Sequence, residues 1–88
     1  MKVVLSPRAE RQLRKLSKIN QIAVVKKIRS IRGETAVSGE EKLKGFRHIF
    51  RVRVGDHRIV YKRTRQSVYI VLIRHRKDVY RLVRQLLR

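Results

Sequence analysis

Near residue 48 the hydrophobic period of the chain changes from the spacing of a helix to the alternation of a strand. Residues 2–5 are predicted to form a short strand, and Ser6 and Pro7 then predict the start of a helix, because Ser is a favourable N-cap and Pro is tolerated in the first turn. Apolar residues then recur at helical spacing through a second helix, for which Gly33 is the expected C-terminal cap. We therefore predict a strand followed by an antiparallel helical hairpin.

In the second half, apolar residues alternate with arginines in a strand that ends at Val54. Gly55 and Asp56 follow, where a two-residue hairpin turn needs a glycine in its first central position. This pattern predicts a hairpin with a return strand over residues 57–62. Residues 68–73 are apolar on both faces, which is typical of an interior strand.

Residues 78–87 carry apolar side chains at helical spacing between arginines, and this pattern predicts an amphipathic C-terminal helix. Residues 34–41 show no periodicity and indicate a surface connection. The resulting order, β-α-α-β-β-β-α, predicts a two-layer α+β fold with the N-terminal helical hairpin packed on a small, mainly antiparallel sheet. A length of 88 residues leaves room for one domain, residues 1–88, with one modest core.

The chain is strongly basic, with 25 Lys or Arg against 6 Asp or Glu and a net charge of +19. Most of this charge lies in residues 42–88, where fifteen basic residues face two acidic ones. Because such a density repels itself in a compact state, a polyanionic or acidic partner is expected. The absence of cysteine excludes disulfides and thiolate metal sites. The N-terminal apolar run is too short for a signal peptide or a membrane span, so the cytoplasm is the expected location.

Alternation places Arg51 and Arg53 on one face of their strand, and Arg58 joins them across the turn. Guanidinium groups suit bidentate contact with phosphate. Charge alone fits a solvated strand face equally well, but an idle surface usually mixes both signs and this hairpin has almost no acids. We therefore interpret the hairpin as a phosphate-binding face for a nucleic acid, with RNA preferred.

A second cluster follows the last strand, at residues 74–80. His75 could act as an acid or base, and Tyr80 could stack on a base. Taken alone, however, a single His is more often an exposed polar residue, and an aromatic residue in an amphipathic helix more often belongs to the core. His48 and His57 lack partners at metal-ligand spacing, so no metal site is predicted.

Three segments together resemble the RelE/ParE toxin superfamily, most closely its RelE branch. They are Leu43-Lys44-Gly45, the hairpin RVRVGDHRIVY at residues 51–61, and HRKDVY at residues 75–80. Their order and spacing match the family, and the predicted element order matches its fold over the whole chain.

The resemblance implies the toxin of a type II toxin–antitoxin pair, namely a ribosome-dependent endonuclease that cuts messenger RNA in the ribosomal A site. In RelE toxins the 2′-hydroxyl attacks the adjacent phosphate, which leaves a cyclic phosphate and a 5′-hydroxyl. This chemistry needs a proton acceptor, cations and an acid, and it needs no metal or other cofactor. The implied partners are a small acidic antitoxin and the ribosome with bound messenger RNA, without a small-molecule ligand or a membrane.

By position, the resemblance assigns Arg58 and Arg76 to the transition-state phosphate and Tyr80 to stacking on the substrate. The other catalytic candidates are Arg53, Arg51 and His75. Further RNA contacts are expected from Lys44, Arg47, Lys62, Arg74 and Lys77.

The family often has lysines where this chain has Arg51 and Arg53, and a guanidinium stays protonated in proteins. Arg51 is therefore a poor proton acceptor. The base is then His75 or Tyr80, or the proton passes to water.

Two other functions fit the same residues. A ParE-like inhibitor of DNA gyrase would act by protein contact, although members of that branch lack the full set of cations. A non-enzymatic RNA-binding module would show steep salt dependence and nearly uniform losses on mutation of any single arginine.

Overall fold

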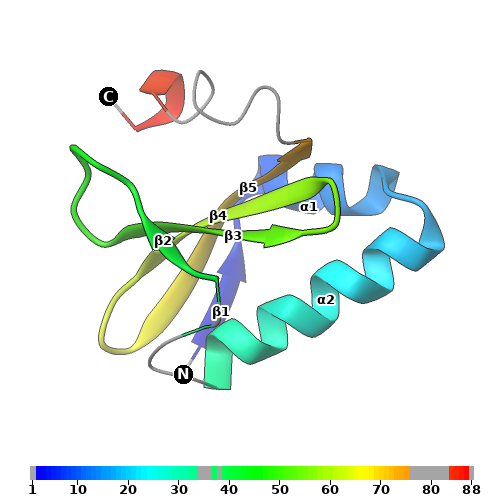
Figure 1. Ribbon diagram of the computed structural model, residues 1–88, viewed down its shortest axis with the longest axis horizontal. Coiled ribbons are helices and arrows are strands. Elements are labelled where there is room, and N and C mark those ends of the chain that lie inside the picture. The colour runs from blue at the N-terminus through cyan, green and yellow to red at the C-terminus, as the bar shows by residue number, and fades with distance from the viewer. Residues whose placement is uncertain (1, 34–36, 38, 76–83, 88) are drawn as a thin grey trace.

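The computed structural model describes residues 2–33, 37, 39–75 and 84–87. Its elements are β1 (Lys2–Leu5), α1 (Pro7–Lys15), α2 (Lys18–Gly33), β2 (Glu41–Lys42), β3 (Ile49–Val54), β4 (His57–Arg63) and β5 (Ser67–His75). The strands form one sheet in the order β1-β5-β4-β3-β2. Only the β1–β5 pair is parallel among these strands. The predicted α+β fold with a mainly antiparallel sheet is confirmed (Figure 1).

Each face of the sheet carries its own hydrophobic cluster. Both helices cover one face, which we call the helix face; its cluster is built from Ala9, Val24, Ile28, Ile31, Val37, Val52, Ile59, Tyr61, Val68, Ile70 and Ile73. The other face, which we call the open face, carries a smaller cluster of Leu43, Ile49, Val60, Val71 and Leu72. β5 supplies residues to both clusters, which confirms the prediction of an interior strand.

Ser6 fixes α1 to the sheet. Its Oγ accepts a hydrogen bond from the Ala9 backbone N–H at 2.9 Å, as an N-cap does, and donates one to the Val71 backbone carbonyl at 2.6 Å. Val71 is the extra residue of a bulge in β5, opposite the register shift between Val60 and Tyr61. The predicted N-cap is confirmed, and the same hydroxyl also holds the bulge.

The predicted hairpin turn is also confirmed. Gly55 has φ 59°, while Asp56 is not among the residues with positive φ. One positive φ at the first central position is the signature of a type II′ turn, whose twist matches that of the flanking strands. The turn therefore sets the register in which Val54 faces His57 and Arg53 faces Arg58.

Three details differ from the sequence-based expectations or go beyond them. Residues 34–41 were expected to form a surface connection, yet Glu41 begins β2, an edge strand too short to show a period. Gly33 is the last residue of α2, and its φ is not positive, so it is not a capping residue outside the helix. Of the predicted C-terminal helix, residues 84–86 are helical, residue 87 is not, and residues 78–83 lie outside the described residues. None of the described helices is long and apolar enough to cross a membrane.

Candidate nucleic-acid interface

Three arginines form a row across the open face. Arg53 in β3 is paired directly with Arg58 in β4, and Arg58 with Arg74 in β5. Residues paired in this way point to the same face, with Cβ atoms about 5 Å apart. They point away from the helices, because the adjacent Val52 and Ile59 belong to the helix-face cluster. The row therefore places three permanent positive charges side by side on the sheet.

The arginine row makes no close ion pair with an acidic side chain in the described part of the chain. No described Asp or Glu lies within 4.0 Å of Arg53, Arg58 or Arg74. Arg53 Nε donates instead to the Gly55 backbone carbonyl at 3.0 Å, which holds its guanidinium near the turn. Since like charges directly opposite one another destabilise a sheet, the row favours an anionic ligand.

Arg51 lies next to the row and forms an ion pair with a carboxylate. Its Nη2 contacts Glu41 Oε2 at 2.9 Å, and Glu41 is the residue directly opposite Arg51 in β2. The hydrogen bond and the positive charge of Arg51, together with a weaker effect of Arg58, lower the pKa of Glu41 below its ordinary value. Glu41 is therefore ionised at neutral pH, and it is the only acidic residue in the five described strands.

Glu40 faces the other way and anchors the chain just before β2. It accepts a hydrogen bond from the Tyr61 hydroxyl, and its Oε1 lies 2.9 Å from Arg63 Nη2. Both side chains of this ion pair are nearly buried, 12% exposed for Glu40 and 13% for Arg63. The Arg63 guanidinium also lies 5.5 Å from the centre of the Phe50 ring. Burial, followed by the hydrogen bond and charge of Glu40, raises the pKa of Tyr61. This buried group positions Glu41 beside the arginine row.

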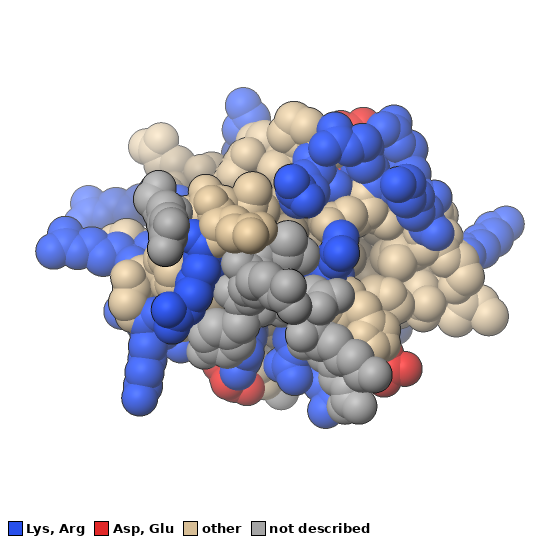
Figure 2. Space-filling view, turned by 90° about the horizontal axis from the view of Figure 1, so that it is seen from above, with Lys and Arg blue, Asp and Glu red and all other residues tan. Residues whose placement is uncertain are grey.

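Of the residues expected to contact RNA, Arg74 belongs to the row, and the others that the structure describes lie on β4 and on the loop between β2 and β3. Lys62 is exposed on β4 in the same row as Ile49 and Tyr69. Lys44 and Arg47 are exposed in the loop between β2 and β3. Figure 2 shows that lysine and arginine side chains greatly outnumber acidic ones on the face it displays.

His75 does not lie beside the arginine row. It is paired with His57, the two rings meet edge to face with centres 6.0 Å apart, and alternation places both on the helix face. A role for His75 as base stays a prediction. Arg76, Lys77 and Tyr80 lie outside the described residues. Within the described chain, no group of three His, Asp or Glu residues could hold a metal ion.

The sequence analysis missed Glu41 as a candidate site residue. The available signal was the Glu40-Glu41 dipeptide, the only pair of adjacent acids in the chain. Because neighbouring residues of an extended chain point to opposite sides, Glu40 points to the helix face and Glu41 to the open face.

Comparisons with known proteins place the chain in a family. The model of the ParE toxin of type II toxin–antitoxin systems (parDE) matches residues 3–80. A search of curated proteins gave no significant match.

Several solved structures share the fold. The isolated RelE toxin of E. coli is 18% identical with a TM-score of 0.75, and the match covers 99% of this chain and 98% of that chain. A RelB-RelE antitoxin-toxin complex from Methanococcus jannaschii matches with 17% identity, a TM-score of 0.74 and coverage of 90% and 96%. The YoeB dimer of Staphylococcus aureus matches with 22% identity, a TM-score of 0.73 and coverage of 85% and 95%.

At these identities the solved structures establish the fold, while the family model spans most of the sequence. The chain therefore belongs to the toxins of type II toxin–antitoxin systems in the RelE/ParE superfamily, and it has the fold of the RelE toxins.

Proposed function

We propose that the protein is a RelE-type toxin that cuts messenger RNA in the A site of the ribosome and so inhibits translation. The observation that carries the proposal is the row of Arg53, Arg58 and Arg74. Three adjacent guanidinium groups with no described acid within 4.0 Å suit a phosphate that gains negative charge during reaction. The likeness in fold to RelE toxins supports the same choice.

In the proposed reaction, the 2′-oxygen attacks the adjacent phosphorus and the bond from phosphorus to the 5′-oxygen breaks. The products are a 2′,3′-cyclic phosphate and a 5′-hydroxyl. We assign the negative charge of the transition state to Arg58, which has an arginine on each side, and contacts with the phosphate backbone to Arg53 and Arg74. By resemblance, Arg76 and Tyr80 complete the site.

Glu41 is the residue that we assign to take the proton from the 2′-hydroxyl. A guanidinium cannot do so, because it stays protonated. The Glu41 carboxylate is ionised, 61% exposed and held on the open face by Arg51 through Oε2, which leaves Oε1 for the substrate. The leaving 5′-oxygen then takes up a proton, for which Tyr80 and water are the candidate donors.

The proposal implies two partners, both of which meet the open face. One is the ribosome with messenger RNA, which places the action of the toxin in the cytoplasm. The other is a small acidic antitoxin, as expected for a chain of net charge +19. The RelB-RelE complex with a similar toxin fold supports this second partner.

Primer extension on programmed ribosomes tests the proposal. Arg58→Ala should cleave messenger RNA at least about a hundredfold more slowly, because it loses a group that stabilises the transition state. The matched control is Arg29→Ala, which removes one exposed charge from α2 and should cleave like wild type. Equal cleavage by wild type and Arg58→Ala would remove the assignment. Equal losses in both variants would instead indicate the plain RNA-binding module.

The matching family model bears the name of ParE, which favours a second candidate function. In this alternative the protein inhibits DNA gyrase by protein contact and cuts no RNA. Supercoiling assays with purified gyrase separate the two functions. Inhibition of supercoiling, without cleavage of messenger RNA on ribosomes, would establish the alternative.

A further inference from the structure

The structure assigns a nucleobase-binding subsite to the loop between β2 and β3, where we infer that Phe46 stacks on a base of the bound RNA. The inference rests on the proposed function for the identity of the ligand as messenger RNA. It adds a second point of contact, separate from the arginine row.

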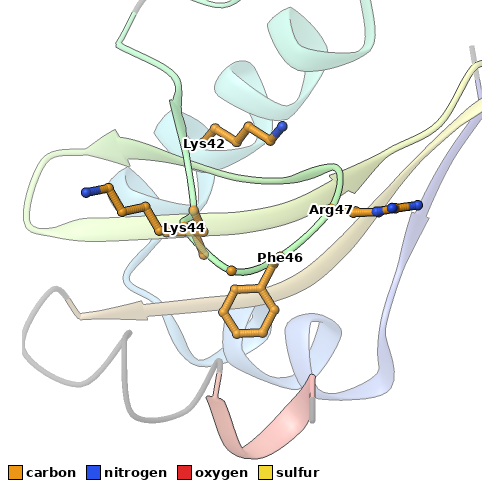
Figure 3. Close-up of a pocket in the computed structure, with 6 residues that line it drawn as sticks. Lys42, Lys44, Phe46 and Arg47 are labelled. Atoms are coloured by element: carbon orange, nitrogen blue, oxygen red, sulfur yellow. The ribbon is translucent and has the colours of Figure 1, made fainter.

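The subsite is a hollow of about 450 Å³ lined by Lys42, Leu43, Lys44, Gly45, Phe46 and Arg47. A smaller hollow of about 290 Å³ shares three of these residues, Lys44, Gly45 and Phe46, and adds Arg84 from the C-terminal turn. The two hollows therefore meet at the Phe46 ring. Figure 3 shows this ring pointing toward the C-terminal turn, with Lys44 and Arg47 extending to opposite sides of the loop.

Phe46 is held from one side. It packs against the open-face cluster together with Leu87, and it remains partly exposed. Leu43, which is 2% exposed, anchors the loop, and its backbone N–H donates to the Ile49 carbonyl at 3.0 Å. Gly45 turns the chain with φ 82°, and a Cβ at this position would meet no atom of the described residues within 4 Å. The loop therefore has open space at Gly45, next to Phe46 in the chain, and its base is fixed.

The chemistry of the lining fits single-stranded nucleic acid. An aromatic ring offers a stacking platform for any base, and the surrounding cations can contact the phosphates on either side of that base. Among the described residues, the lining of the two hollows includes the cations Lys42, Lys44, Arg47 and Arg84 and no acid. An acidic peptide would also be attracted by the cations, but it has no need of a stacking surface.

The position of the hollow supports RNA as the occupant. Phe46 packs in the cluster that contains Ile49, and Ile49 shares the open face with Arg51 and Arg53. Four residues of strand separate Ile49 from Arg53, which is about 13 Å. A strand of RNA needs only a few nucleotides to cover this distance. One RNA can therefore occupy the arginine row and the hollow together.

Steady-state cleavage on programmed ribosomes tests the inference, with KM and kcat measured separately. Phe46→Leu keeps an apolar side chain but loses the ring, so KM should rise about tenfold while kcat stays within about twofold. Phe46→Tyr keeps the ring and should behave like wild type. Lys44→Gln should raise KM, whereas the matched control Arg29→Gln should not.

Two outcomes of these measurements would overturn the inference. The first is an unchanged KM for Phe46→Leu; if this variant also loses affinity for the antitoxin, the hollow belongs to that protein. The second is equal impairment of Phe46→Leu and Phe46→Tyr, which would indicate a packing role alone.

If the wild type cuts no messenger RNA, the proposed function is wrong, but the subsite is not yet tested. The subsite is then tested with a short single-stranded RNA that contains 2-aminopurine, and equal fluorescence quenching by wild type and Phe46→Leu would reject it.

Discussion

Arg58 lies directly opposite Arg74 in the sheet, and neither has an acidic partner within 4.0 Å among the described residues. Two like charges in this relation lower the stability of the free protein. Arg53 repeats the relation on the other side of Arg58. The protein is therefore less stable without a bound anion than it would be without these repulsions. Proteins often have such a loss of stability at a functional site.

Arg58→Gln should therefore stabilise the free protein while it loses cleavage. Removal of the central charge relieves two cross-strand repulsions, so the free energy of unfolding should rise by about 0.5–1 kcal/mol and Tm by a few degrees. Thermal denaturation followed by circular dichroism measures the change. Inorganic phosphate should raise the Tm of wild type more than that of Arg58→Gln, because the ligand then offsets the repulsion. A lower Tm for the variant would contradict this account of the row.

Glu41→Gln should separate binding from chemistry. The variant keeps the size of the side chain but loses the carboxylate that we assign as the proton acceptor, so kcat should fall by about a hundredfold or more. RNA affinity should stay the same or increase, because the variant lacks the negative charge of Glu41 and the open face is more positive. Fluorescence anisotropy with labelled RNA measures the affinity. If kcat is unchanged, Glu41 is not the base, and His75, Tyr80 and water are again the candidates.

The pH dependence of cleavage distinguishes Glu41 from His75 as the base. Arg51 lowers the pKa of Glu41 below its ordinary value of 4.5, so the active carboxylate is present above that pH and is lost only as the pH falls through the lowered pKa. Cleavage assigned to Glu41 should thus be nearly constant between about pH 5.5 and 8. A base that changes its charge near neutral pH would instead give a fall in rate within this range. The rate of single-turnover cleavage, measured across this pH range, shows whether the rate stays constant or falls at low pH.

Most of the fold follows from local patterns. Alternation in β3, the glycine at the hairpin turn and the Ser6 cap each have a local physical cause, and all three were predicted from sequence. β2 was missed because two residues cannot display a period, and its pairing with β3 depends on contacts with distant residues such as Tyr61 and Arg63.

The position of Arg74 shows why the site was harder to predict than the fold. In the register of Tyr61 with Ile70, continued without interruption, Ile73 would lie opposite Arg58. The extra residue at the bulge moves the register by one, which brings Arg74 into the row and turns His75 to the helix face. Sequence analysis placed Arg74 among the RNA contacts, but nothing in the local pattern indicates the bulge.

The buried pair of Glu40 and Arg63 should show strong coupling. Arg63→Met leaves a nearly buried carboxylate without its charge partner, so the free energy of unfolding should fall by about 3 kcal/mol or more. Glu40→Gln in the same chain removes that charge, so the double variant should be more stable than the sum of the two single changes implies, by about 1–3 kcal/mol. Urea unfolding of the two single variants and the double variant measures the coupling.

The exposed pair of Glu10 and Arg14, whose side chains are 58% and 68% exposed, provides the control for this measurement. Its coupling energy should stay below about 0.5 kcal/mol, since a solvated pair in a helix gains little from its charges. If the buried pair is coupled no more strongly than the exposed one, then Glu40 does not anchor β2. The position of Glu41 beside the arginine row would in that case need another cause, because Glu40 is the residue that joins β2 to the buried hydroxyl of Tyr61.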